Sequence, residues 1–265
     1  MLPKMLIGCS AKSYLTLDAG RRWAEQVANE LREKDLSGEG VYICPPFPLI
    51  PLFLELLEGS GVAVGTQDVS MYPPGPYTGE VSAPLLAELG VRYVMTGHPE
   101  RRRLFGEGPR EFNRKVLVTA EVGMVPILVV GEPERIGNPG PVLREQVQAA
   151  LRDFPAAADL VVAYEPTWAI GQAEPASGDH VVATIARLRE IIADFASQTR
   201  ILYGGSAKLG TYGDIGAAAG AHLAGLPDGI FLGRGGLEAV SFVQTIEEVR
   251  RTGATVRASV STSRP

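Results

Sequence analysis

Short apolar runs alternate with longer amphipathic segments eight times along the 265-residue chain. Continuous apolar runs are typical of strands buried on both faces, and strands that alternate with helices favour a parallel sheet. The apolar runs are Lys4–Cys9, Gly40–Cys44, Val62–Thr66, Val91–Met95, Val125–Val130, Leu160–Tyr164, Ile201–Tyr203 and Gly229–Leu232. The helix-like segments are Asp18–Lys34, Phe47–Glu58, Ala83–Glu88, Arg110–Glu121, Pro141–Arg152, Gly178–Phe195, Tyr212–His222 and Glu238–Arg250. Eight units of this length predict an α/β fold with one (β/α)8 barrel over residues 1–251, and the alternative is an open doubly wound sheet with the same local pattern.

Helix-start signals support several of these segments, and two stretches fit neither pattern. Asp18, Ser82 and Ser177 are placed where an N-cap side chain accepts hydrogen bonds from free backbone N–H groups. Residues 67–80, QDVSMYPPGPYTGE, are too rich in proline and glycine for a helix, and the sequence from Thr252, TGATVRASVSTSRP, lacks any periodicity. We therefore predict a functional loop at 67–80 and a flexible C-terminal tail at 252–265.

Composition and charge exclude several classes of partner. The formal net charge of −5 gives no basic surface for nucleic acid or an anionic membrane. The longest apolar run, residues 122–130, is interrupted by glycine and proline and is shorter than the ~20 residues of a spanning helix. The apolar stretch near the start, Met5–Ile7, is shorter than the ~7 residues that a secretory signal needs. Two cysteines, Cys9 and Cys44, cannot form a disulfide framework, so we expect a cytoplasmic protein that binds neither nucleic acid nor membrane.

Reactive side chains follow the ends of five predicted strands, which is where a barrel of this type carries its active site. Taken singly, each has an ordinary structural interpretation: a solvated lysine, a structural histidine, a turn-capping glutamate and common glycine turns. Together they place a cation, an imidazole and a carboxylate beside glycine-rich turns whose N–H groups suit a phosphate. The segments are Ser10–Lys12, Gly97–Arg102, Glu165–Gly171, Gly204–Ser206 and Gly233–Gly236.

The motifs YEPTWAIG, GHPERR, YGGS and GRGG, in this order and spacing, resemble those of the triosephosphate isomerase family, the original TIM barrel. GPYTGE in the 67–80 loop and VVGE at Val129–Glu132 add to the resemblance, which covers residues 4 to 250. That family pairs an ionised glutamate base with a neutral histidine. The resemblance implies that Glu165 is the base, His98 the electrophile, Lys12 the cation that stabilises the enediolate, and Glu100 the partner that positions Lys12.

The same resemblance implies how a small phosphorylated sugar is held. Ser10 would form part of the substrate pocket, and the segment 166–176 would form a lid. Thr78 in the 67–80 loop would pair two copies into a homodimer. The resemblance implies no cofactor and no metal, and it leaves His180 and His222 as structural or surface residues. The phosphate would be held by backbone N–H groups of Gly171, Ser206, Gly233 and Arg234.

Several residues that frame the substrate depart from the family pattern. The family has asparagine at Ser10, serine at Pro99 and glycine at Arg234, and its lid carries Thr-Gly-Lys where this chain has Gln-Ala-Glu-Pro; Val129 replaces a usual cysteine. The predicted catalytic residues are those of the family, whereas the residues that frame the substrate differ. This combination suggests the same proton transfer on a different substrate. The related erythrulose-phosphate isomerases convert L-erythrulose 1-phosphate to D-erythrulose 4-phosphate, and we expect this activity. The alternatives are ordinary triosephosphate isomerase activity and an inactive barrel that binds a phosphorylated ligand.

Overall fold

Eight parallel strands close into a barrel in the computed structural model, which describes residues 1–171 and 175–261. Each strand pairs with its neighbour in sequence, and β8 pairs with β1 to complete the circle. Every predicted apolar run overlaps one strand, so the prediction of a single (β/α)8 barrel is confirmed. The strands are β1 Leu6–Ser10, β2 Val41–Cys44, β3 Ala63–Thr66, β4 Tyr93–Thr96, β5 Val125–Val130, β6 Asp159–Tyr164, β7 Gln198–Tyr203 and β8 Gly229–Leu232.

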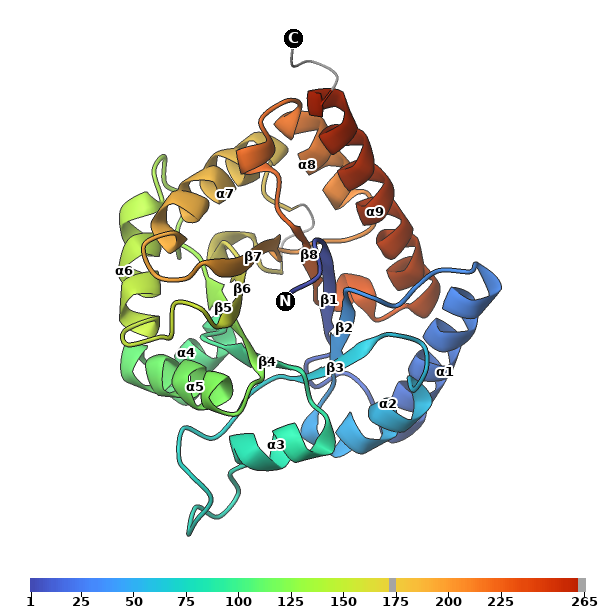
Figure 1. Cartoon of the computed structure of the whole chain (residues 1–265), viewed down its shortest axis with the longest axis vertical. Coiled ribbons are helices and arrows are strands. Elements are labelled where there is room, and N and C mark those ends of the chain that lie inside the picture. Colours follow the sequence, from blue (N-terminus) through green and yellow to red (C-terminus); the bar gives the residue numbers. More distant parts are fainter. Residues whose placement is uncertain (172–174, 262–265) are drawn as a thin grey trace.

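The helices form a ring around the barrel, and the 67–80 loop between β3 and α3 extends outward from that ring (Figure 1). No helix in the described ranges is long and apolar enough to cross a membrane. The α-helices are α1 Leu17–Glu33, α2 Ile50–Leu56, α3 Ala83–Leu89, α4 Pro99–Phe105, α5 Pro109–Glu121, α6 Gly140–Ala150, α7 Gly178–Ile192, α8 Thr211–Ala219 and α9 Ala239–Ser261. Short 3-10 helices are η1 Phe47–Leu49, η2 Thr167–Ala169, η3 Leu223–Gly225 and η4 Arg234–Gly236.

The strands are buried on both faces because the core has two layers. In β5, Val125, Ile127 and Val129 belong to the cluster inside the barrel. Leu128 and Val130, from the same strand, belong to the cluster between the barrel and the helices. Alternate side chains of a strand point to opposite faces, so both sets must be apolar. This explains the continuous apolar runs. Because all the strands are parallel, their carboxyl ends lie together at one rim of the barrel.

The helix starts agree only in part with the predictions. The N-cap of α1 is Thr16, whose hydroxyl accepts a hydrogen bond from the Ala19 N–H at 3.2 Å, whereas Asp18 lies in the first turn. Ser82 and Ser177 occupy N-cap positions as predicted, although neither side chain makes the capping hydrogen bond. The helix α4 was not predicted at all, because its seven residues form too short a segment to show a clear apolar period.

The predicted tail at 252–265 is wrong in its boundary, because α9 continues through Ser261. The continuation packs against α8: a Cβ added to Gly216 would lie 2.4 Å from Thr252 Cγ2 and 3.6 Å from Val256 Cγ2. Val256 is buried at this contact. Tertiary packing therefore stabilises helix in a sequence rich in serine, threonine and valine, which have only moderate helix propensity. Residues 262–265 lie outside the described residues.

Candidate active site

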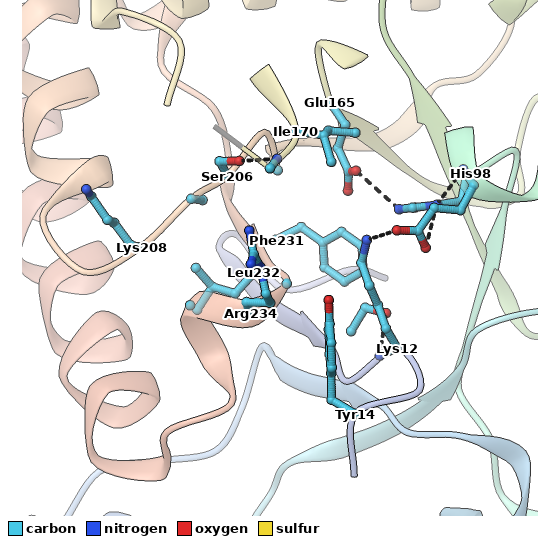
Figure 2. A pocket seen from close by; sticks show the side chains of 17 residues that line it. Lys12, Tyr14, His98, Glu165, Ile170, Ser206, Lys208, Phe231, Leu232 and Arg234 are labelled. Atoms are coloured by element: carbon cyan, nitrogen blue, oxygen red, sulfur yellow. Dashed lines mark hydrogen bonds and ion pairs between the residues drawn. The ribbon is translucent and has the colours of Figure 1, made fainter. Parts of the chain in front are cut away.

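A cavity of about 450 Å³ opens at the carboxyl ends of the strands. The structure brings all nine predicted site residues to its lining, from five different strand ends (Figure 2). Tyr14 and Phe231 also line the cavity, and the sequence had not singled them out. The nine are Ser10, Lys12, His98, Glu100, Glu165, Gly171, Ser206, Gly233 and Arg234.

Lys12 follows β1 by two residues and has a left-handed backbone with φ of +44°. A side chain in this conformation is strained, so neighbouring groups must hold it in place. Gln67, directly after β3, supplies this support by donating hydrogen bonds to the carbonyl oxygens of Lys12 and Cys44, both at 2.9 Å. Sequence reasoning did not identify Gln67 as a site residue, although its position just past a strand end was the available signal.

His98 is the N-cap of α4, and its Nδ1 accepts a hydrogen bond from the Glu100 N–H at 3.1 Å. A ring nitrogen that accepts a hydrogen bond carries no proton, so this contact assigns the ring proton to Nε2. Nε2 lies 3.5 Å from Glu165 Oε2, on the side that faces the cavity. Pro99 is the first residue of α4, where a backbone N–H has no intrahelical acceptor, so its missing donor does not weaken the helix.

Lys12 and Glu100 form an ion pair across the cavity floor, with Nζ 2.5 Å from Oε1. Partial burial of Glu100 opposes ionisation, but the hydrogen bond from Lys12 and nearby positive charge outweigh it. Together they hold the pKa of the Glu100 carboxyl below its usual value. The carboxylate therefore stays charged throughout the neutral range and fixes the position of the lysine.

Glu165 is buried beside a glycine that leaves room for its side chain. Its backbone N–H donates to the Val130 carbonyl at 2.8 Å, which ties the residue to the end of β5. A Cβ added to Gly204 would lie 2.6 Å from Glu165 Cγ and 2.7 Å from Oε1. Real Cβ atoms do not approach so closely, so only glycine at position 204 allows this placement of the carboxylate.

The far end of the cavity is built by the turns after β6, β7 and β8. The Ser206 hydroxyl donates to the Ala169 carbonyl at 2.7 Å and accepts from the Gly171 N–H at 3.0 Å. The Gly171 N–H, predicted to hold phosphate, is therefore engaged within the protein in this conformation. Arg234 begins η4, whose first N–H groups have no intrahelical acceptor. Of the predicted lid 166–176, residues 172–174 lie outside the described residues.

A buried polar network lies behind Glu165, and sequence reasoning missed its role. Glu132, fully buried just past β5, accepts hydrogen bonds from Trp168 Nε1 at 2.8 Å and from the Tyr164 hydroxyl at 3.0 Å. His180 Nε2 lies 3.2 Å from Glu132 Oε1 and 2.8 Å from the Tyr164 hydroxyl. Burial, with the charge of Glu132, raises the pKa of the Tyr164 hydroxyl well above its usual value, so that it stays a donor. The network fixes the η2 turn that follows Glu165.

The remaining titratable groups give no sign of a metal centre. Within residues 1–171 and 175–261, no group of three or more histidine, cysteine or acidic side chains is arranged to hold a metal ion. His222 was predicted on a helix but lies past the end of α8, where it is exposed. The chemistry that the cavity itself offers is proton transfer between a carboxylate and an imidazole, with a lysine placed beside them.

Comparison with known proteins agrees with this geometry. The family model described as triosephosphate isomerase matches residues 5–249. The chain belongs to the triosephosphate isomerase family. A triosephosphate isomerase of Idiomarina loihiensis is 38% identical over 203 residues, covering 72% of this chain and 81% of that protein. An L-erythrulose-1-phosphate isomerase of Pectobacterium atrosepticum is 34% identical over 256 residues, covering 92% of this chain and 95% of that protein.

Solved structures of the family show the same fold. The crystal structure of triosephosphate isomerase from Bartonella henselae superposes with a TM-score of 0.78 at 28% identity, and the match covers 94% of this chain and all of that one. Relatives of nearly equal identity thus carry two different substrate names. Membership of the family is clear, and the substrate has to be argued from the cavity.

Proposed function

We propose that this member of the triosephosphate isomerase family interconverts L-erythrulose 1-phosphate and D-erythrulose 4-phosphate through an enediolate. In this reaction the carbonyl moves from C2, beside the phosphate-bearing carbon, to C3. The fourth carbon, a hydroxymethyl group on C3, distinguishes this substrate from the triose. The site must therefore hold a phosphate at one end and a hydroxymethyl group at the other.

The proposed steps use three side chains of the cavity. The Glu165 carboxylate removes the proton from C3, and the electron pair of that C–H bond forms the C2–C3 double bond. His98 Nε2–H hydrogen-bonds to the carbonyl oxygen and moves a proton between the two oxygens. Lys12 stabilises the negative charge that develops on them. Glu165 then returns its proton to C2, so no cofactor is needed and all atoms balance.

The observation that carries the substrate proposal is the opening of the cavity past Ser10. A second cavity of about 580 Å³ shares Ser10, Lys12, Tyr14, His98 and Glu100 with the first. Ser10 thus lies where the reaction centre meets this second cavity. Because we propose below that a second copy covers the outer rim of that cavity, we assign the extra space to the position of the Ser10 side chain itself. The side chain of serine is smaller than that of asparagine by about as many atoms as a hydroxymethyl group contains. Within residues 1–171 and 175–261, the one contact of the Ser10 hydroxyl is a long hydrogen bond of 3.4 Å from the Lys12 N–H, which leaves it available to a substrate hydroxyl.

A comparison of two substrates and two variants tests this proposal. We expect kcat/KM for L-erythrulose 1-phosphate to exceed that for glyceraldehyde 3-phosphate in the wild type. Ser10→Asn should lower the ratio of kcat/KM for L-erythrulose 1-phosphate to kcat/KM for glyceraldehyde 3-phosphate by about 10-fold or more, because the asparagine side chain fills the space for the hydroxymethyl group. Ser197→Asn, the same change at the amino end of β7, should leave the ratio unchanged. A higher value for the triose in the wild type would instead favour ordinary triosephosphate isomerase activity, the name that most of the compared relatives carry.

A homodimer remains part of the proposal, with the 67–80 loop as its contact. Tyr72 and Tyr77 stack with ring centroids 4.4 Å apart, which stiffens the loop that carries the exposed Thr78. The second cavity has an apolar rim that includes Leu104 and Phe105, each 62% exposed. Large exposed apolar side chains beside a cavity fit a protein contact, and the loop of a second copy would cover them. Cytoplasmic location also remains proposed, and the two free, buried cysteines are compatible with it.

A further inference from the structure

The cavity holds an arginine that the proposed chemistry does not use. Arg234 lies directly after Gly233 in the turn that follows β8, and its side chain lines the cavity. Figure 2 shows this side chain directed into the cavity, between Ser206 and Lys12. Taking the proposed sugar-phosphate chemistry as its basis, we propose that the Arg234 guanidinium binds the substrate phosphate and is a substrate-binding side chain particular to this chain.

The charges around the cavity leave Arg234 as the cation available to an anion. Lys12 is paired with Glu100 at 2.5 Å, so its charge is largely balanced. Lys208 also lines the cavity, but Figure 2 shows its amino group directed away from the centre. Among the described residues, the Arg234 side chain has no hydrogen-bond or ion-pair partner, and the backbone carbonyl of Arg234 accepts a hydrogen bond from the Leu237 N–H at 3.2 Å. No acidic side chain in the described part of the chain pairs with this guanidinium, so it is available to an anionic ligand.

Arg234 lies on the opposite side of the cavity from the reaction centre. Glu165 and His98 face each other on one side, and Arg234 lies near Ser206 on the other (Figure 2). Lys12 lies between them: a Cβ added to Gly233 would be 3.9 Å from Lys12 Cε. A substrate whose carbonyl contacts His98 and Lys12 would extend its phosphate toward Arg234.

The chemistry of the side chain suits a phosphate better than a neutral sugar group. A guanidinium is planar, permanently charged, and donates two parallel hydrogen bonds that match two phosphate oxygens. Backbone N–H groups bind the same oxygens without a net charge. Glycine, the usual residue of the family at this position, has no side chain to contribute. The arginine therefore adds a charge-assisted contact to the backbone contacts that the resemblance implies.

Calorimetric titration with inorganic phosphate tests the role of Arg234 without any turnover. We expect Arg234→Gln to weaken phosphate binding by about 10- to 100-fold, the range for one lost hydrogen-bonded charge. Arg234→Lys, which keeps the charge but loses the fork, should lie between this variant and the wild type. The matched control is Arg144→Gln, which removes the same charge from an exposed pair with Asp194 on the outer helices. Control and wild type should bind phosphate equally.

Binding by Arg234→Gln within twofold of the wild type would overturn the inference, as would a wild type that does not bind phosphate. Because the Arg234 side chain has no partner among the described residues, its substitution should leave the melting temperature unchanged. The Arg234→Lys titration answers the question if the glutamine variant does not fold. Failure of the proposed function looks different: the wild type would bind phosphate through Arg234 and yet fail to isomerise L-erythrulose 1-phosphate.

Discussion

Replacing Gly204 with alanine measures how closely the Glu165 carboxylate must be positioned. The new Cβ would lie 2.6 Å from Glu165 Cγ and 2.7 Å from Oε1. Ordinary carbon contacts begin at about 3.5 Å, so the carboxylate must move by about 1 Å. A displacement of this size at a reacting group costs about 100-fold in rate. We therefore expect kcat of Gly204→Ala to fall by about 100-fold, measured by NMR with L-erythrulose 1-phosphate.

The fold should survive this substitution, because Gly204 has no positive φ and the contact is with a side chain that can rotate. Circular dichroism and the melting temperature would check this point. The matched control is Gly137→Ala, since an added Cβ there meets nothing within 4 Å. A folded Gly204→Ala variant with kcat within threefold of the wild type would refute the argument that Glu165 needs this placement.

Three further outcomes follow from the contacts around the cavity. Gln67→Ala removes two hydrogen bonds to the carbonyls of Lys12 and Cys44. We expect KM to rise, and the free energy of unfolding in denaturant titration to fall by about 1–3 kcal/mol. No change in either quantity would contradict the role of Gln67. Folding lowers the pKa of Glu100, so its ion pair with Lys12 stabilises the folded protein at pH values above the unfolded-state pKa of about 4.3. This stabilisation is lost as the pH falls through the pKa of Glu100 in the folded protein. The free energy of unfolding of the wild type should therefore exceed that of Glu100→Gln by up to about 1 kcal/mol near neutral pH, and this difference should disappear in acid. Melting curves in which the difference stays constant down to pH 3 would contradict the role of the ion pair. Thr78→Arg should convert a dimeric wild type into a less active monomer in sedimentation, whereas a fully active monomeric wild type would exclude the proposed loop contact.

The strands and the site residues were predictable because both follow from local sequence. A strand buried on both faces must be a continuous apolar run, and residues just past such runs meet at one rim of the barrel. The sequence alone therefore predicts that Lys12, His98 and Glu165 lie together. The same rule also covers Gln67, directly past β3, and Glu132, two residues past β5, but the sequence does not show that Gln67 supports the Lys12 backbone or that Glu132 anchors a buried network.

The features that escaped prediction depend on tertiary contacts. The extension of α9 depends on Gly216, whose missing side chain lets Thr252 and Val256 approach α8. His180 gave no local sign that its ring would reach Glu132 from α7. The direction of the Arg234 side chain is likewise set by the turn that carries it. Local periodicity reports which face of an element is buried, but it does not report which distant side chain lies there.

Isotope exchange in ordinary water is the most direct test of the central claim, that Glu165 removes a proton from the carbon next to the substrate carbonyl. L-Erythrulose 1-phosphate carrying deuterium on C3 would be incubated with wild type and with Glu165→Gln and followed by NMR. We predict loss of deuterium at the rate of isomerisation in the wild type, and a loss at least about 100-fold slower in the variant. Retention of the deuterium by the wild type, or equal loss in a folded Glu165→Gln protein, would contradict the account.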